Sequence, residues 1–317
     1  MILFISEQRN IHDERLFEGL SSLTKVVWQP NATKELIQNL PKQVQSILVS
    51  PLNNHHVEII RSLYSTKSIY LLSYAQEILE VYQRPDTPSF ALLKHNLYLC
   101  NGVIVDCNKL QNIIEKDFGF RGRVLKTTYF WRQDFLKSTT PKEKQNSIGT
   151  NRTFTVIHNN KLIFDSLSEL NEDYQFYFIA KGEELRTVYN ESYRSSSLDK
   201  KIVAMGFSRD QTDFFSNIGI YVSASLYDGT SISLLEAMSN GKICVVPDIP
   251  CNLEIIQNGV NGFLYKNNSK DSLTEVLKSV LLLGESTRGT IEKNAIITAE
   301  KLANWKGNIE EVFNFIY

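Results

Sequence analysis

The stretch Gly219–Leu264 decides the fold, and it reads GIYVSASLYDGTSISLLEAMSNGKICVVPDIPCNLEIIQNGVNGFL. It opens with a short apolar run, Ile220–Ser223, which predicts a β-strand. A polar loop, Ala224–Gly229, follows this run. A second apolar run, Ile243–Val246, is continuous rather than alternating, so it predicts a strand buried on both faces of a parallel sheet.

Between the two runs the sequence predicts a helix. Hydroxyl residues that suit an N-cap precede it at Thr230 and Ser231, and Gly241 ends it. Strand, loop, helix and strand form a βαβ unit, whose first loop lies where open parallel sheets bind ligands. Small hydroxyl residues and a helix N-terminus suit an anion in that loop. Two carboxylates frame this loop, because Asp228 lies before the helix and Glu236 lies inside it.

Several short motifs of this stretch occur together in one known family. They are Asp228-Gly229, Glu236-Ala237-Met238, Gly241, Pro247-Asp248, Glu254 and Asn258-Gly259-Val260-Asn261-Gly262. The set resembles the donor-site signature of family 4 glycosyltransferases, which is Glu-x7-Glu, then Gly-x-Pro-Val-Val-x-Ser-Asp and a Glu before an Asn-Gly turn. This chain departs from the signature at three places. Asp228 stands where the family has its first Glu, and Lys242-Ile243 stands where the family usually has a small residue or Pro. Cys251 stands where the family frequently has Gly.

The resemblance implies an α/β chain with the GT-B fold, in which two Rossmann-like domains face a cleft and the C-terminal helix crosses back to the first domain. It implies a hexosyl-type glycosyltransferase that moves a sugar from a nucleotide-sugar donor to a saccharide, lipid-linked or other hydroxyl acceptor. Such enzymes retain the anomeric configuration and need no metal or other cofactor. We expect a UDP-sugar in preference to a GDP-sugar, and a cleft that closes to exclude water.

Composition agrees with a two-domain globular protein. The chain has 317 residues, 42% of them apolar and 22% charged. A formal net charge of −1 gives no reason to expect a nucleic-acid partner. No run approaches the ~20 apolar residues of a spanning helix, and Met1–Ile5 is too short for a signal peptide. We therefore expect a cytoplasmic protein, and peripheral contact with the inner face of the membrane stays open.

Apolar runs alternate with amphipathic stretches along residues 1–137, which favours a parallel α/β sheet. The predicted strands of this part are Ile2–Ile5, Val26–Trp28, Ser46–Val49, Ser68–Leu72, Leu97–Leu99 and Val103–Val105. The polar run Lys137–Asn146 suits a linker. We expect an acceptor-binding domain over residues 1–140, a donor-binding domain over 141–300 and a helix over 301–317 that packs on the first domain.

The second half repeats the alternation. Besides the two runs above, its predicted strands are Phe154–Ile157, Phe176–Ile179 and Ile202–Ala204. Helical spacing predicts helices over Ser272–Leu283 and Thr298–Tyr317. The last helix resembles the one that returns to the first domain in GT-B enzymes, and an ordinary packing helix is the alternative.

Three residues are the expected catalytic set. The resemblance makes Arg152 and Lys161 the cations that neutralise the donor diphosphate as the sugar leaves, without a metal. Their spacing is longer than in the family, and solvated surface cations are the alternative. Asp228 would hold hydroxyls of the transferred sugar, and its alternative role is to turn the loop before Gly229.

Further residues are expected to bind the donor. Glu236 suits the ribose diol, because a carboxylate accepts two hydrogen bonds; a plain helix-face Glu is the alternative. The other expected donor contacts come from the loop and helix start, from a Gly-Phe pair at the nucleobase, and from the place of the family's Gly-x-Gly loop. They are Gly229, Thr230, Ser231 and Ile232, then Gly206 and Phe207, then Gly182.

Signals for other chemistry are weak. No His, Cys and carboxylate set has metal-ligand spacing, so we expect no metal site. His12, His55, His56 and His95 are weak candidates for the acceptor site. Two rival functions stay open: a non-catalytic GT-B homologue that serves as a binding or chaperone subunit of a partner transferase, and a nucleotide-sugar epimerase. Asp in place of Glu favours the first, and the second requires acid and base residues that the sequence does not identify.

Overall fold

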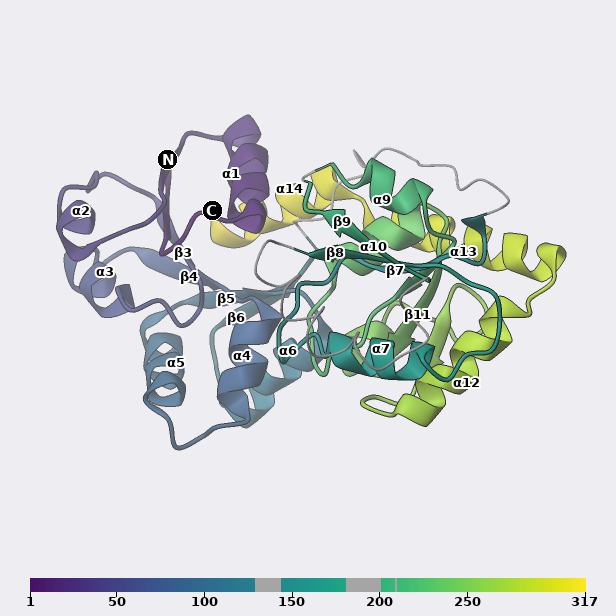
Figure 1. Cartoon of the computed structure of the whole chain (residues 1–317). Helices are drawn as coiled ribbons and strands as arrows, with labels where there is room; N and C mark the ends of the chain where they lie inside the picture. The colour runs from purple at the N-terminus through teal and green to yellow at the C-terminus, as the bar shows by residue number, and fades with distance from the viewer. Residues whose placement is uncertain (129–143, 181–200, 209) are drawn as a thin grey trace. The chain divides into compact units, whose positions relative to one another are not determined.

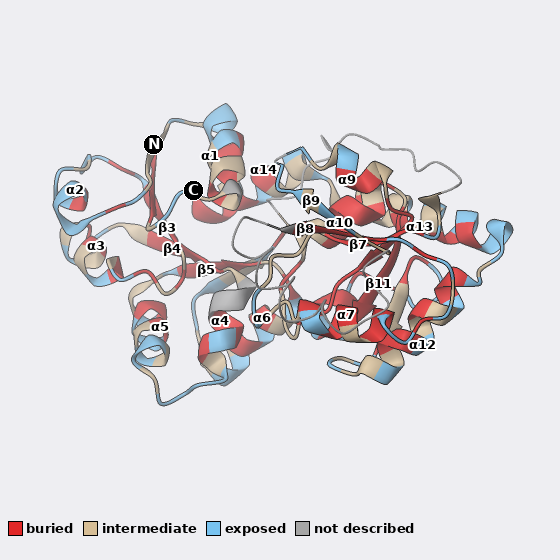
Figure 2. Ribbon diagram, in the orientation of Figure 1, coloured by how far each residue is buried: buried red, intermediate tan, exposed pale blue. Residues whose placement is uncertain are grey.

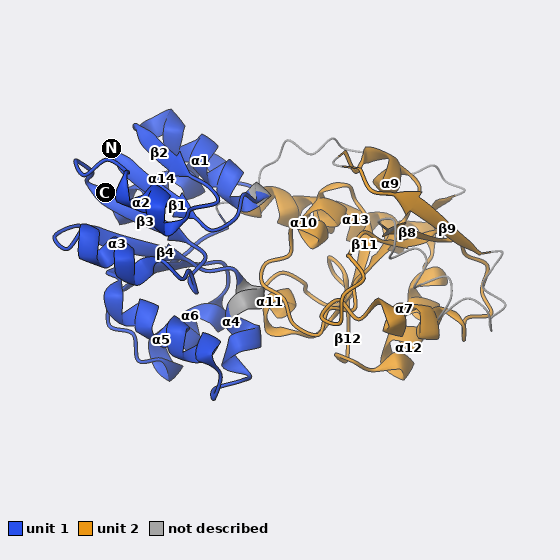
Figure 3. Cartoon of the chain, turned by 60° about the vertical axis from the view of Figure 1, so that its left-hand side comes forward, with its two compact units in different colours: residues 1–132, 303–317 blue, residues 133–302 orange. Residues whose placement is uncertain are grey.

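The computed structural model describes residues 1–128, 144–180, 201–208 and 210–317 (Figure 1). The chain forms two compact units (Figure 3). Unit 1 comprises Met1–Arg132 and Ala303–Tyr317, and unit 2 comprises Gln133–Leu302. Within the described residues each unit holds a six-stranded sheet whose paired strands run parallel, which confirms the predicted two-domain α/β fold. Most of the predicted linker, and the predicted donor residue Gly182, lie outside the described residues.

The sheet of unit 1 has the order β2-β1-β3-β4-β5-β6. Its strands are β1 (Ile2–Ser6), β2 (Val26–Gln29), β3 (Ser46–Ser50), β4 (Ser68–Leu72), β5 (Gly102–Val105) and β6 (Arg123–Lys126). Every residue of β1 and β3 is buried. Figure 2 colours buried residues red. The apolar runs of these two strands are continuous because helices cover both faces of a parallel sheet.

The helices of unit 1 are α1 (Ile11–Leu23), α2 (Lys34–Gln38), α3 (Val57–Leu63), α4 (Ala75–Tyr82), α5 (Pro88–Leu99), α6 (Asn108–Asn112), the π-helical turn η1 (Ile113–Asp117) and α14 (Trp305–Ile316). The predicted strand Leu97–Leu99 is wrong, since these residues form the last turn of α5. Thr87 caps that helix by accepting a hydrogen bond from the Phe90 amide at 3.3 Å. A three-residue apolar run carries no period that separates strand from helix.

The sheet of unit 2 has the order β12-β11-β10-β7-β8-β9. Its strands are β7 (Ile148–Thr150), β8 (Phe176–Ala180), β9 (Ile202–Gly206), β10 (Ile220–Val222), β11 (Ile243–Pro247) and β12 (Phe263–Tyr265). Strand β10, helix α10 (Ile232–Ser239) and β11 confirm the predicted βαβ unit. Gly241 follows α10 at φ +65°, a left-handed conformation that glycine adopts without strain.

The first strand of unit 2 was predicted in the wrong place. Residues Phe154–Ile157 form a loop in which Val156 is 88% exposed, and the strand lies earlier, at β7. The middle residue of strand β7 is Gly149, which is buried. A larger residue would not fit there, because a Cβ on Gly149 would lie 2.6 Å from a methyl group of Ile218. A three-residue strand with a central glycine shows no apolar run, so the pattern pointed to the next apolar residues instead.

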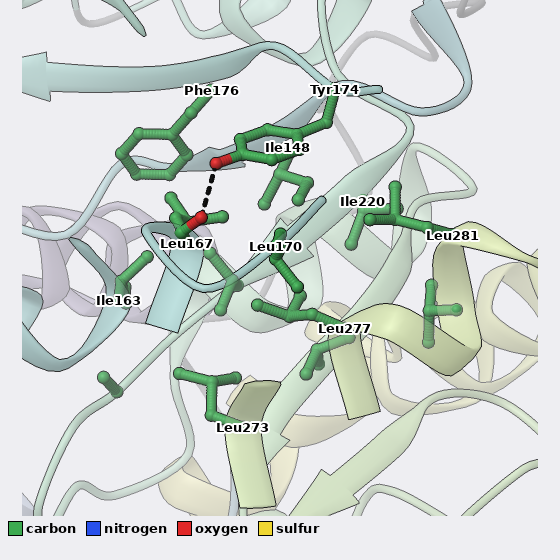
Figure 4. Close-up of a cluster of buried hydrophobic side chains, with 14 of the residues drawn as sticks. Ile148, Ile163, Leu167, Leu170, Tyr174, Phe176, Ile220, Leu273, Leu277 and Leu281 are labelled. Atoms are coloured by element: carbon green, nitrogen blue, oxygen red, sulfur yellow. Dashed lines mark hydrogen bonds between the residues drawn. The ribbon is translucent and has the colours of Figure 1, made fainter. Parts of the chain in front are cut away.

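One hydrophobic core of unit 2 lies on one face of the sheet. The helices in the described part of unit 2 are α7 (Asn160–Leu167), α9 (Thr212–Ser216), α10, α11 (Pro250–Leu253), α12 (Lys270–Leu281) and α13 (Glu285–Leu302). Side chains of β7, β8 and β10 pack against α7 and α12 (Figure 4). Tyr174 closes this core, and its hydroxyl donates to the Leu167 carbonyl at 2.6 Å. The packing fixes the strand ends on which the candidate site is built.

The predicted single helix Thr298–Tyr317 is wrong, because the chain forms α13 and α14 with a break between them. Asn304 starts the second helix, and its side chain accepts from the Gly307 amide at 3.3 Å. Helix α14 belongs to unit 1, where Ile309 packs so closely that a Cβ on Gly19 would come within 2.6 Å of it. No helix in the described parts of the chain is long and apolar enough to cross a membrane.

Candidate active site

The loop that follows β7 brings Arg152 to the loop that follows β10. Strands β7 and β10 are neighbours, so their carboxyl ends lie side by side at one edge of the sheet. Arg152 Nη2 lies 2.6 Å from Asp228 Oδ2, and the two side chains are only 11% and 13% exposed. Arg152 Nη1 donates to Ser231 Oγ at 3.2 Å. The structure therefore joins three of the predicted site residues in one partly buried contact.

Asp228 and Ser231 also shape the backbone around this contact. Asp228 Oδ1 accepts from the Gly229 amide at 2.9 Å, so the carboxylate turns the loop with one oxygen and holds Arg152 with the other. Ser231 is the N-cap of α10, and its hydroxyl accepts from the Leu234 amide at 3.4 Å. Both alternative roles considered for these residues, turn and cap, are present together with the contact to Arg152.

His158 completes the cluster around Arg152. Its Nε2 lies 2.7 Å from Arg152 Nη2, and its Nδ1 lies 2.9 Å from the Thr153 carbonyl oxygen. Burial, and then the charge of Arg152, lower the pKa of His158 to about 4. Sequence reasoning did not select this residue; its signal was its position six residues after Arg152 in a polar loop.

Hydrogen bonds to the backbone hold the two loops. Asn160, the buried first residue of α7, donates through Nδ2 to the carbonyls of Arg152 and Thr153 at 3.0 and 3.2 Å. The Leu226 amide donates to the Ile157 carbonyl at 2.8 Å, which ties the β10 loop to the β7 loop. These bonds fix the backbone on which Arg152 and Asp228 stand.

The sequence model of the family described as glycosyl transferases group 1 matches residues 132–297, which include this site. The chain belongs to the glycosyl transferases group 1 family.

Its curated relatives include the UDP-Gal:alpha-D-GlcNAc-diphosphoundecaprenol alpha-1,3-galactosyltransferase of Escherichia coli. That protein is 29% identical over 113 residues, which are 36% of this chain and 29% of that protein. The N,N'-diacetylbacillosaminyl-diphospho-undecaprenol alpha-1,3-N-acetylgalactosaminyltransferase of Campylobacter jejuni is 27% identical over 135 residues, 43% of this chain and 35% of that protein. The chain thus spans about a third of the length of these relatives.

Solved structures match the whole of this group 1 chain. The Anabaena protein Alr3699/HepE in complex with UDP has a TM-score of 0.77 at 14% identity and 99% coverage of both chains. Sucrose-phosphate synthase of Thermosynechococcus elongatus has a TM-score of 0.80 at 11% identity, over 99% of this chain and 98% of that one. These likenesses show the fold and confirm the predicted GT-B class.

Glu236 of this family member lies near the same cluster. It stands in α10 and is only 8% exposed. Arg152, Asp228 and Glu236 all act electrostatically on the hydroxyl of Tyr221 in β10, whose pKa is raised chiefly by burial. Glu236 therefore stands in the helix whose N-cap, Ser231, contacts Arg152. Its predicted role toward a ribose stays a prediction.

The other predicted residues occupy several places in unit 2. Gly229, Thr230, Ser231 and Ile232 form the turn into α10. Lys161 lies in α7, is 75% exposed and pairs with Asp165 at 2.5 Å one turn further on. Gly206 ends β9, two strands away from β7, and Phe207 after it is 55% exposed. Among the described residues no group of three His, Cys, Asp or Glu side chains is placed to hold a metal ion.

Proposed function

We propose that this chain is a retaining, metal-independent hexosyl-type glycosyltransferase that uses a UDP-sugar and a lipid-linked saccharide acceptor. The observation that carries the proposal is the partly buried contact of Arg152, Asp228 and Ser231 at the carboxyl edge of the unit 2 sheet. It lies within the segment that matches the family. A fixed guanidinium beside a helix start suits a diphosphate.

The names of similar proteins support the choice of donor and acceptor. The Escherichia coli relative is named for UDP-Gal and a diphosphoundecaprenol-linked acceptor, and the Campylobacter jejuni relative for a diphospho-undecaprenol-linked acceptor. The Anabaena structures are complexes with UDP and with UDP-glucose. An acceptor of that kind resides in a membrane, so the proposal includes a cytoplasmic enzyme with peripheral contact to the inner membrane face.

The residues proposed to contact the donor differ in charge according to the part of the donor that each one binds. Arg152 and Lys161 hold the diphosphate, helped by the amides of the turn into α10. Glu236 accepts hydrogen bonds from the ribose hydroxyls. Gly206, Phe207 and Gly182 belong to the nucleobase side of the site. The acceptor binds to unit 1.

In the proposed reaction the bond between the sugar and the β-phosphate breaks while the acceptor hydroxyl attacks from the same face. The departing phosphate oxygen takes the acceptor proton, so no separate protein base is required. Arg152 stabilises the negative charge that grows on that phosphate. Asp228 exchanges its contact with Arg152 for hydroxyls of the sugar, which orients the sugar toward the acceptor.

Two measurements test the proposal. Calorimetry with UDP, GDP, UDP-glucose, UDP-galactose and UDP-N-acetylgalactosamine should show binding that prefers the uridine nucleotides. Incubation with undecaprenyl-diphosphate-linked acceptors should then give a product whose NMR coupling constants show retention, in the presence of EDTA. Failure to bind any nucleotide diphosphate would remove the proposal.

A second function is favoured by one observation. Asp228 stands where the family signature has Glu, and it is already paired with Arg152. A GT-B homologue without turnover, acting as a binding subunit of a partner transferase, would tolerate this. Tight donor binding without transfer to any acceptor would support that function instead.

A further inference from the structure

The hydrogen bonds of His158 fix its tautomer. A guanidinium can only donate, so the 2.7 Å contact with Arg152 Nη2 requires an unprotonated Nε2 on His158. A carbonyl oxygen can only accept, so the 2.9 Å contact with the Thr153 oxygen requires a proton on Nδ1. His158 therefore stands as a neutral imidazole that presents its lone pair to Arg152.

Arg152 is held by two acceptors of different charge at the same nitrogen. Its Nη2 contacts Asp228 Oδ2 at 2.6 Å and His158 Nε2 at 2.7 Å. The carboxylate neutralises the guanidinium, whereas the neutral imidazole orients it and leaves its positive charge intact. Of these two contacts, only the one with His158 restrains Arg152 without neutralising it, so the full positive charge stays available for an incoming diphosphate.

We propose that His158 is a positioning residue that holds the Arg152 guanidinium in place when Asp228 turns away to the sugar. This inference rests on the proposed function and extends it to a residue outside the family signature. Without His158, Arg152 would keep only its 3.2 Å hydrogen bond to Ser231 Oγ at the moment when the donor replaces the carboxylate, and the diphosphate would have to order a less restrained side chain.

The electrostatic surroundings agree with this role. Arg152 in the β7 loop lowers the pKa of His158, after burial as the larger cause, and the Thr153 carbonyl and Asp228 in the β10 loop act in the opposite direction. The net pKa of about 4 keeps the imidazole neutral at pH 7. Lys161 of α7 pairs with Asp165 at 2.5 Å. Protonation in acid would remove the lone pair and set two cations against each other.

Two substitutions distinguish the effect of the Nε2 lone pair from the effect of the aromatic ring. His158→Gln can place an amide oxygen near the position of Nε2 and does not titrate. His158→Phe keeps a ring and has no acceptor. Calorimetry at pH 8 with UDP should show about tenfold weaker binding for His158→Phe, a loss of about 1.4 kcal/mol, and near wild-type binding for His158→Gln. Uridine, which lacks phosphates, should bind both variants as it binds wild type.

Nitrogen NMR of the histidine side chains supplies a readout that does not depend on a donor. We expect the Nδ1–H tautomer for His158 in wild type, and a His158 pKa that rises toward its ordinary value in Arg152→Gln. A His158 that carries its proton on Nε2, or one whose pKa ignores Arg152→Gln, would overturn the inference. So would equal UDP affinity in wild type and a folded His158→Phe.

The calorimetry and the NMR measurement distinguish a failure of the proposed function from a failure of the inference about His158. A wild-type protein that binds no nucleotide diphosphate would refute the proposed function, and the NMR arm would still decide whether His158 holds Arg152. A wild type that binds UDP, together with a silent His158→Phe, would refute the inference alone. Thermal melting of both variants checks that each is folded.

Discussion

Arg152 and Asp228 form a partly buried ion pair of 2.6 Å although 76 positions separate them in the chain. They meet because β7, whose end carries Arg152, is the direct neighbour of β10, whose end carries Asp228. The pair has no net charge, so a donor diphosphate must compete with Asp228 for the guanidinium.

Arg152→Ala should weaken UDP binding by about 1.5–3 kcal/mol, because the lost hydrogen bond is charge-assisted. It should also lower the free energy of unfolding by up to about 3 kcal/mol, since Asp228 would stay largely buried without its partner. Calorimetry and urea unfolding measure the two effects. Arg152→Lys is the matched control: its charge restores stability, while the loss of the planar fork leaves UDP binding weak. Unchanged UDP affinity in the alanine variant would exclude a phosphate role.

Lys161→Ala should weaken UDP binding if Lys161 leaves Asp165 to reach the diphosphate. The exposed pair itself contributes little to stability, so the variant should unfold like wild type. Asp165→Asn is the informative partner, because it frees Lys161 and should strengthen UDP binding slightly. If neither substitution alters UDP affinity in calorimetry, Lys161 is a solvated surface cation.

Glu236→Gln should weaken the binding of UDP by about 1–2 kcal/mol, because an uncharged amide is a poorer acceptor for the ribose diol. The shape of the side chain is preserved, so the fold should not change. A UDP analogue without the 2′ and 3′ hydroxyls provides the control and should bind wild type and variant equally. Equal affinity for UDP itself would leave Glu236 as a helix residue without a ligand.

The opening βαβ unit could be predicted because its signals are local. The apolar runs, the hydroxyl cap at Ser231 and the left-handed Gly241 each act within a few residues. The pairing of Arg152 with Asp228 could not be predicted, because it depends on the strand order that sets β7 beside β10. The displacement of β7 from the predicted Phe154–Ile157 concealed that Arg152 directly follows a strand.

Two other features show why short patterns mislead. His158 looks like any polar loop residue, and its value as an acceptor appears only when the loop folds back onto Arg152. Leu97–Leu99 looks like a strand because three apolar residues have no period, and the cap at Thr87 lies too far upstream to be read with them. Residues that depend on distant contacts are the ones that sequence patterns miss.

Asp13 in unit 1 should make stability depend on pH. This fully buried carboxylate accepts hydrogen bonds from Tyr74, from Ser50 at 3.3 Å and from Asn10 at 2.9 Å, and burial raises its pKa from 3.8 to about 6. The folded state therefore binds more protons than the unfolded state between these values. The contribution of Asp13 to stability is present below pH 3.8 and is lost as pH rises through about 6.

Asp13→Asn removes the titrating carboxyl group, so a comparison with wild type gives the direction in which Asp13 changes stability with pH. Hydrogen exchange of unit 1 peptides should show that wild type loses protection relative to the variant between pH 5 and pH 7. The neighbouring His12, whose pKa burial lowers to about 4, acts in the opposite direction in both proteins and cancels in the comparison. A difference between wild type and variant that does not change with pH would contradict the raised pKa.

Asp228→Asn should lower kcat by roughly 100-fold or more, since a carboxylate that orients the sugar contributes several kcal/mol to the barrier and each ~1.4 kcal/mol is tenfold in rate. The affinity for UDP should stay the same or rise, because Arg152 is no longer shared with a carboxylate. The turn should survive, since an asparagine oxygen can still accept from the Gly229 amide. Steady-state kinetics and calorimetry on the same preparation separate these effects.

Asp228→Glu is the matched control for this last prediction, because it restores the residue of the family signature and keeps the negative charge. Its extra methylene should cost far less activity than the loss of charge in Asp228→Asn. If Asp228→Asn turned over as fast as wild type, the carboxylate would serve only the turn and the contact with Arg152. If Asp228→Glu gained transfer activity that wild type lacks, Asp228 would mark a donor-binding subunit, since the carboxylate would then be one methylene too short to reach the sugar.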